Sequence, residues 1–277
     1  MMKDLEFLEH VIDQKSQMIL DANDRIWEYA ELAYHETRSA DLLCQILKDE
    51  GFSVTTGDAG IPTCFTGTFS YGSGKPVMGI LGEYDALSSL SQKAASPRKE
   101  PVEAGAPGHG CGHSALGTGS LAAVLAVKEY LVENKKDGTI IYFGCPAEEQ
   151  LTGKVFMARN GAFNGLDCAF AWHGGKVNRV GLGTSNGLNS AIFHFKGRTA
   201  HAGGDPHNGR SALDGAELMS VGANYLREHV TSDIRIHYVY KEAGTAPNIV
   251  PDRAAVWYYV RGMSRPAIED AYDRLLK

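Results

Sequence analysis

The 277-residue sequence lacks the features that usually accompany binding to nucleic acids or membranes. Its 33 acidic residues outnumber its 27 basic ones, and the formal net charge is -6, whereas nucleic-acid-binding domains are usually basic. No run of lysine and arginine stands out, and no apolar run reaches the length of a membrane span. We therefore expect no nucleic-acid partner and no membrane partner.

Cysteine is scarce, and its five positions form no recognisable framework. An odd, scattered set does not suggest disulfides, and the absence of any C-x-x-C pair argues against a closed structural zinc site. The N-terminal stretch carries early acids and no continuous apolar core, so we expect no signal peptide and reduced thiols in the cytoplasm. We interpret three cysteines as buried filler of the core: Cys44, Cys64 and Cys168.

The sequence also lacks internal repeats and low-complexity tracts, and its order of elements predicts two domains. Helical patterns at 4–34 and 38–50 precede strands and helices that alternate from 77 to 172, which predicts an α/β fold with a mostly parallel sheet and helices on both faces. The last third reads as β-α-β-β-α, which predicts a small antiparallel α+β, ferredoxin-like domain. We place the two domains at 1–185 and 186–277.

Polar side chains follow each predicted strand of the mostly parallel sheet at its carboxyl end. Ligands of open α/β sheets bind beyond these ends, so the side chains are expected to lie close together. Scattered surface residues would not be expected to gather in this way. The strand ends contribute five candidates: Glu83 and Asp85 after VMGIL, Glu148 and Glu149 after TIIYF, and His173 after CAFAW.

The stretch GHGCGH, directly before the predicted helix 114–134, adds Cys111 between His109 and His113. Thiolate, imidazole and carboxylate together suit zinc, and imidazole with carboxylate also suits manganese. The start of a helix near Ser114 is expected to lower the pKa of the Cys111 thiol, and a metal ion would lower it further. Of two adjacent glutamates in a turn, one can bind metal while the other acts as general base.

One other chemistry competes for these residues, and so does a purely structural interpretation. Cys111 could be the nucleophile of a cysteine-histidine hydrolase, but that mechanism leaves the two glutamates after TIIYF unexplained. Taken one by one, a cysteine is most often buried filler, and a Glu-Glu pair is most often solvated surface. The sequence leaves two roles open for His109: a residue beside the metal, or a purely structural part of the turn.

Six motifs resemble those of the metal-dependent amidohydrolase family of aminoacylases, hippurate hydrolases and carboxypeptidase-like enzymes, most of all the branch of the aminobenzoyl-glutamate hydrolase B subunit. They span about residues 80 to 255. The resemblance implies a catalytic domain with two divalent metal ions, zinc or manganese, and an inserted lid or dimerisation domain. The motifs are GEYDAL, GHGCGHSALGTGSLAA, GCPAEEQLTGKVFMARNGAF, AWHGG, GRTAHAGGDPHNGRSALDGAELM and APNIVPDRA.

The resemblance also implies roles for individual residues of the first domain. Glu148 matches the general base, and Asp85 matches the acidic residue that orients the metal site. Ser114 stands where many relatives carry Asp or Asn. Four residues match metal ligands: Cys111, His113, Glu149 and His173.

In the second domain, His201 matches a lid histidine that reaches the active site of a partner subunit and stabilises the oxyanion. Asn248 matches a lid asparagine that contacts substrate, and Arg210 is a weaker candidate for binding a substrate carboxylate. The resemblance therefore implies a homodimer formed through the lid domain, and it leaves room for a second, different subunit.

The resemblance implies hydrolysis of a small N-acyl or N-aroyl amino acid or a dipeptide, with aminobenzoyl-glutamate as the specific candidate. Family members continue beyond the lid and supply a last ligand histidine, for which we find no residue before Lys277. We therefore expect the chain to be C-terminally incomplete. The alternative hypothesis is an inactive fragment that serves as a dimerising or metal-binding module.

Overall fold

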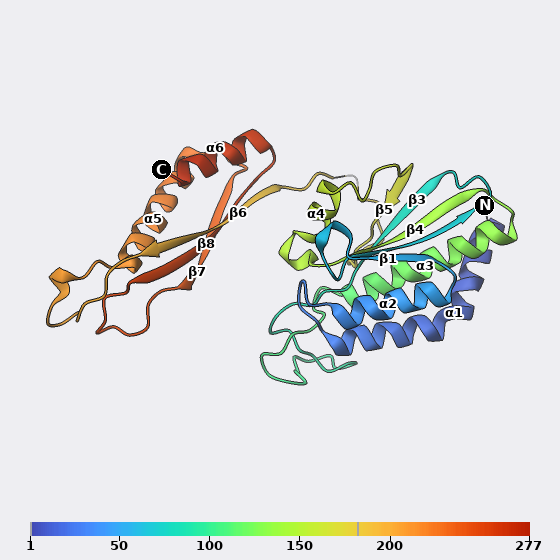
Figure 1. Cartoon of the computed structure of the whole chain (residues 1–277), viewed down its shortest axis with the longest axis horizontal. Helices are drawn as coiled ribbons and strands as arrows, with labels where there is room; N and C mark the ends of the chain where they lie inside the picture. The colour runs from blue at the N-terminus through green and yellow to red at the C-terminus, as the bar shows by residue number, and fades with distance from the viewer. Residues whose placement is uncertain (1, 182) are drawn as a thin grey trace. The chain divides into compact units, whose positions relative to one another are not determined.

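The computed structural model describes residues 2–181 and 183–277. The chain forms two compact units, Met1–Asn178 and Arg179–Lys277 (Figure 1). Each unit has its own hydrophobic core and is described by itself.

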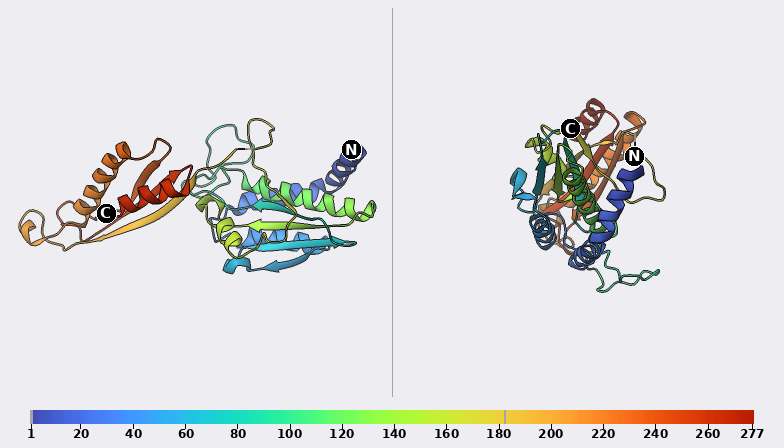
Figure 2. Two further views of the ribbon diagram at one scale, coloured as in Figure 1. Left: turned by 90° about the horizontal axis from the view of Figure 1, so that it is seen from above. Right: turned by 90° about the vertical axis from the view of Figure 1, so that its right-hand side faces the viewer.

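The first unit is built on a five-stranded sheet in the order β1-β2-β4-β3-β5, whose strands run side by side in Figure 2. β3 pairs in parallel with β4 and β5, whereas β2 is antiparallel to β1 and β4. Four strands therefore share one direction, which confirms the expected mostly parallel sheet. The strands are β1 Ser53–Thr56, β2 Phe65–Tyr71, β3 Val77–Glu83, β4 Gly138–Cys145 and β5 Cys168–Phe170.

Helices cover both faces of this sheet. Successive side chains of β4 point to opposite sides, so each face packs against its own set of helices. Ile140 and Tyr142 enter a core shared with α1, α2 and α3, while Phe143 and Cys145 enter a smaller core that contains Met157 of α4. The helices are α1 Met2–Tyr29, α2 Thr37–Asp49, α3 His113–Glu133 and α4 Gly153–Arg159, with short 3-10 turns η1 Asp58–Gly60 and η2 Glu148–Gln150.

Two expectations about this unit were wrong. The first predicted helix, 4–34, already ends at Tyr29, because Ala30 has a φ of +44° that no α-helix accommodates. Cys168 is exposed rather than buried filler, because it lies on β5 at the edge of the sheet.

α3 also contradicts the expectation that no apolar run reaches membrane-spanning length. The most apolar 18-residue stretch of this 21-residue helix has a mean hydropathy of 1.3, so by length and composition the helix could cross a bilayer. However, 56% of that stretch is buried inside the protein, and Leu121, Val124 and Leu125 are fully buried against the sheet. We therefore interpret α3 as the core helix of the first unit.

The second unit is an antiparallel sheet in the order β6-β8-β7 with both helices on one face, as expected. Alternate residues of β8, such as Val256 and Tyr258, pack against the helices, because side chains on a strand alternate between faces. The elements are β6 Gly187–Lys196, η3 Pro206–Asn208, α5 Ala212–Leu226, η4 Arg227–His229, β7 Arg235–Glu242, β8 Arg253–Gly262 and α6 Arg265–Leu275.

Candidate metal centre

The sheet of the first unit brings the predicted strand ends together. Glu83 at the end of β3 is in register with Cys145 at the end of the parallel neighbour β4, so the residues that follow both strands leave the sheet at the same edge. η2, which carries Glu148 and Glu149, follows β4 after two residues. α3 begins at His113 beside them.

His113 is the buried centre of this arrangement, with no solvent exposure. Its Nδ1 lies 2.9 Å from Oδ1 of Asp85, which is also buried, and Oδ2 of Asp85 accepts a hydrogen bond of 2.9 Å from the backbone N–H of Glu149. Burial alone would lower the pKa of His113, but the hydrogen bond to Asp85 and the nearby carboxylates outweigh it and raise the pKa. Asp85 therefore links the imidazole to the glutamate turn.

A second pair of candidate ligands lies next to His113. Sγ of Cys111 is 3.2 Å from Nε2 of His173, and the rings of His113 and His173 meet edge-on with centroids 5.8 Å apart. One potential ligand atom from each of Cys111, His113 and His173 lies within 4.8 Å of the other two. This spacing suits ligands that share one ion.

The Cys111 thiol does not behave as expected from its place beside a helix start. Burial, followed by the charges of Glu149, Glu148 and Glu83, raises its pKa to about 11. The expectation of a lowered pKa was wrong, because burial and the carboxylates around the thiol outweigh the helix. The same carboxylates would favour a cation beside the sulfur.

The two adjacent glutamates diverge around His113. Oε2 of Glu148 is 3.7 Å from its Nε2, whereas Oε1 of Glu149 is 3.9 Å from its Nδ1. Burial, together with the charges of Asp85 and Glu148, raises the pKa of Glu149. One turn therefore presents a carboxylate to each side of the imidazole.

This turn has a buried support that the sequence did not reveal. Ala147 and Leu151, which flank η2, adopt positive φ angles of 53° and 58°, uncommon for residues other than glycine. Oε1 of Glu36 accepts a hydrogen bond of 2.8 Å from the N–H of Ala147, and Oε2 accepts one of 3.0 Å from Thr63. Glu36 is fully buried, and its hydrogen bond to Ala147 stabilises the strained turn from the protein interior.

The centre contains buried polar atoms that lack a hydrogen-bond partner among the described residues. They are Oε2 of Glu83, Nε2 of His113 and Oε1 of Glu149. Potential ligand atoms of Glu83, His113 and Glu148 also lie within 4.8 Å of one another. Buried acceptors without donors are costly, so these atoms and the mixed thiol, imidazole and carboxylate set fit divalent cations.

His109 is not part of this set. It is buried, and its Nε2 donates a hydrogen bond of 2.9 Å to the carbonyl oxygen of Ile26, while its ring lies beside Trp27. Burial lowers its pKa to about 4. The neutral ring therefore attaches the loop before Cys111 to α1.

The three other predicted site residues lie in the second unit. Nδ1 of His201 accepts hydrogen bonds from the N–H groups of Gly203 and Gly204, at 3.2 and 3.0 Å. The carbonyl oxygen of Asn248 accepts one of 3.0 Å from Ala202, so His201 and Asn248 sit on neighbouring segments.

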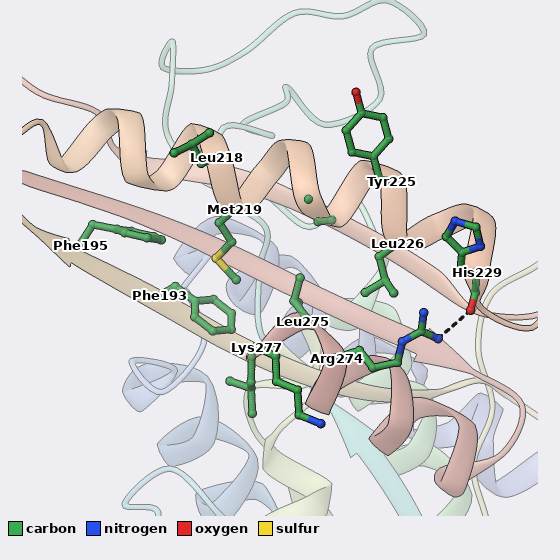
Figure 3. Close-up of a pocket in the computed structure, with 13 residues that line it drawn as sticks. Phe193, Phe195, Leu218, Met219, Tyr225, Leu226, His229, Arg274, Leu275 and Lys277 are labelled. Carbon is green, nitrogen blue, oxygen red and sulfur yellow. Dashed lines mark hydrogen bonds between the residues drawn. The ribbon is translucent and has the colours of Figure 1, made fainter.

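Arg210 pairs through its backbone with Arg198, and its guanidinium donates to the carbonyl oxygen of His207 at 3.1 Å. The second unit also has a groove between α5, α6 and β6, lined by residues such as Phe193, Met219 and Leu275 (Figure 3). The three candidates are not among the residues that line this groove.

Comparison with known proteins shows what this chain is similar to. Residues 184–277 match the family model of the peptidase dimerisation domain. The chain is 41% identical over 276 residues to the B subunit of p-aminobenzoyl-glutamate hydrolase from Escherichia coli. Residues 184–277 therefore resemble the dimerisation domain of M20 peptidases, and the chain as a whole resembles this Escherichia coli subunit.

Two solved structures share the fold. An aminobenzoyl-glutamate utilization protein from Klebsiella pneumoniae gives a TM-score of 0.73 at 21% identity, over 97% of this chain and 72% of that one. A dinuclear metal-binding M20 peptidase from Bacillus subtilis gives 0.61 at 18% identity, over 94% and 67%. The match to the Escherichia coli relative covers 98% of this chain but only 56% of that protein, so the chain spans little more than half the relative's length.

Proposed function

We propose that the metal centre of this chain hydrolyses the amide bond of a small N-acyl or N-aroyl amino acid or a dipeptide, with p-aminobenzoyl-glutamate as the first candidate. The observation that carries the proposal is the group of thiol, imidazole and carboxylate donors around buried His113, whose Nε2 lacks a hydrogen-bond partner among the described residues. The name of the Escherichia coli relative supports the choice of substrate.

In this proposal, Cys111, His113, Glu149 and His173 hold two divalent ions, zinc or manganese. Bound ions of this kind polarise a carbonyl group and lower the pKa of a water molecule. Asp85 fixes the His113 ring, because Nδ1–H donates to Asp85 and leaves the lone pair of Nε2 available.

Glu148 is the proposed general base. Its side chain is 28% exposed, more than that of Glu149 at 17%, so substrate and water can reach it. Glu148 accepts the proton of the attacking water and then passes it to the leaving amine, which balances the proton over the reaction.

His201 is suited to stabilise the oxyanion. Two backbone N–H groups donate to its Nδ1, so a neutral ring carries its proton on Nε2 and offers that N–H as a donor. We propose that it serves the active site of a partner copy, in a homodimer formed through the dimerisation domain. Asn248 and Arg210 would bind the substrate and its carboxylate.

The test is metal-dependent turnover by the purified chain. We expect bound zinc or manganese in elemental analysis, and release of p-aminobenzoate from p-aminobenzoyl-glutamate that stops when a chelator removes the metal. Turnover that survives metal removal would contradict the proposal and support a cysteine nucleophile. A folded chain that binds no metal and turns over no acyl-amino acid would also contradict it.

A further inference from the structure

Glu83 and His113 bring two buried polar atoms close together without a hydrogen bond between them. Oε2 of Glu83 lies 3.1 Å from Nε2 of His113, yet both atoms are buried and neither has a hydrogen-bond partner among the described residues. Nδ1 of His113 points to a carboxylate oxygen of Asp85, an acceptor, so the ring proton of the neutral imidazole belongs on Nδ1. In the neutral ring, two lone pairs therefore face each other across 3.1 Å.

From this geometry we propose that Glu83 is a further metal ligand, which holds one ion together with Nε2 of His113 and is positioned by Lys154. The inference rests on the proposed function, because it assigns a ligand to the same centre. At metal–ligand bonds of about 2.1 Å, atoms 3.1 Å apart subtend an angle of about 95° at the ion, which is compatible with neighbouring ligands. Glu83 was seen in the sequence only as a polar residue at a strand end.

Lys154 explains how the carboxylate of Glu83 is aimed. Its Nζ forms an ion pair with Oε1 of Glu83, and both side chains are largely buried, at 29% and 11% exposure. The pair occupies one oxygen and leaves Oε2 directed at His113. Lys154 lies on α4, directly after the glutamate turn, so the same chain segment carries both features.

The centre then has two chemically different halves. In one, a carboxylate oxygen of Glu83 lies beside Nε2 of His113, and in the other Cys111 and His173 supply sulfur and nitrogen. Softer thiolate and imidazole ligands favour zinc or cobalt, whereas carboxylates also accept manganese. Only the Cys111 half contains a thiolate, so the cobalt–thiolate absorption reports on that half alone. Loss of metal binding without loss of this absorption therefore reports on the Glu83 half.

The experiment measures zinc and cobalt binding to the 277-residue chain, without substrate. The variants are Glu83→Gln, which removes the ligand charge, Lys154→Met, which removes only its partner, and Glu83→His, which replaces the carboxylate by another ligand. Glu100→Gln is the matched control, because Glu100 is an exposed glutamate paired with Lys93. Circular dichroism checks the fold of each variant.

We expect Glu83→Gln to weaken the binding of one ion at least about 100-fold while the cobalt–thiolate absorption persists. Lys154→Met should weaken it about 10-fold, within the range for groups that orient ligands, and Glu83→His should restore zinc binding. Glu100→Gln should change nothing. If Glu83→Gln does not fold, Glu83→His and Lys154→Met decide between ligand and structural ion pair.

Unchanged metal affinity in folded Glu83→Gln would overturn the inference and leave the proposed function intact. Equal loss of stability in Glu83→Gln and Lys154→Met, with metal binding preserved in both, would make the pair purely structural. Absence of metal from the unmodified chain would contradict the proposed function, and the ligand assignment with it.

Discussion

The buried imidazole of His113 donates from Nδ1 to Oδ1 of Asp85 across 2.9 Å, while the other oxygen of Asp85 accepts the backbone N–H of Glu149 at the same distance. One carboxylate therefore orients a proposed ligand histidine and fixes the turn that carries the paired glutamates. A role of this kind is tested by metal affinity rather than by turnover alone.

Asp85→Asn should weaken metal binding about 10- to 100-fold, as expected for a group that orients a ligand. The amide can donate to Nδ1 of His113, which would move the ring proton to Nε2 and block the lone pair that binds metal. Competition between the chain and a zinc chelator measures the change. The control is Asp167→Asn, because Asp167 is an exposed acid that accepts a hydrogen bond from the N–H of Val77. Equal affinity in both variants would contradict the role of Asp85.

Glu148→Gln should abolish hydrolysis of p-aminobenzoyl-glutamate while bound metal persists. The amide keeps the size of the side chain but cannot accept the proton of the attacking water. Turnover and elemental analysis of the same preparation measure both properties. Loss of metal together with activity would sink the assignment as general base, and activity near that of the unmodified chain would do so as well.

The sequence predicted the gathering of Asp85, His113 and the two glutamates because parallel strands end at one edge, a consequence of topology alone. It could not predict contacts that depend on side chains brought together from distant positions. Glu36 reaches the N–H of Ala147 across 111 residues, and Lys154 reaches Glu83 across 71. Neither residue carries a local motif that reveals its partner.

The same limit explains the errors. A pattern of apolar residues indicates that α3 is buried or spans a membrane, and only its contacts with the sheet decide between the two. The pKa of Cys111 is raised by burial and by three carboxylates that are distant in the sequence, so the nearby helix start gave the wrong direction. The role of His109, which the sequence left undecided, is explained by its hydrogen bond to the backbone of α1.

Gly117→Ala should destabilise the first unit by about 1–3 kcal/mol, although alanine usually favours a helix. A Cβ at this position would lie 2.6 Å from the backbone oxygen of Glu83, so α3 would have to move away from the end of β3. The matched control is Gly222→Ala on α5, where a Cβ would meet no atom within 4 Å and stability should rise by about 0.5–1 kcal/mol. Chemical denaturation of both variants measures these changes, and equal effects would contradict the close approach of α3 to β3.

Glu31 gives a prediction about pH. Its carboxylate accepts hydrogen bonds from the N–H groups of Arg38 and Ser39 in the first turn of α2, at 3.1 and 2.9 Å, and so satisfies helix donors from outside the helix. Burial alone would raise the pKa of Glu31, but the hydrogen bonds from Ser39 and Arg38 outweigh it and lower the pKa below its ordinary value of 4.5.

Glu31→Gln should therefore reduce the free energy of unfolding of the first unit by about 1 kcal/mol at neutral pH, the usual cost of losing a helix cap. Because the folded pKa of Glu31 is depressed, this stabilisation is fully present above pH 4.5 and is lost as the pH falls through the folded pKa. Urea denaturation at neutral and acidic pH measures the difference between variant and unmodified chain. Glu9→Gln, at an exposed position of α1, is the control. A difference that stays constant as the pH falls would show that the charged carboxylate of Glu31 does not stabilise α2.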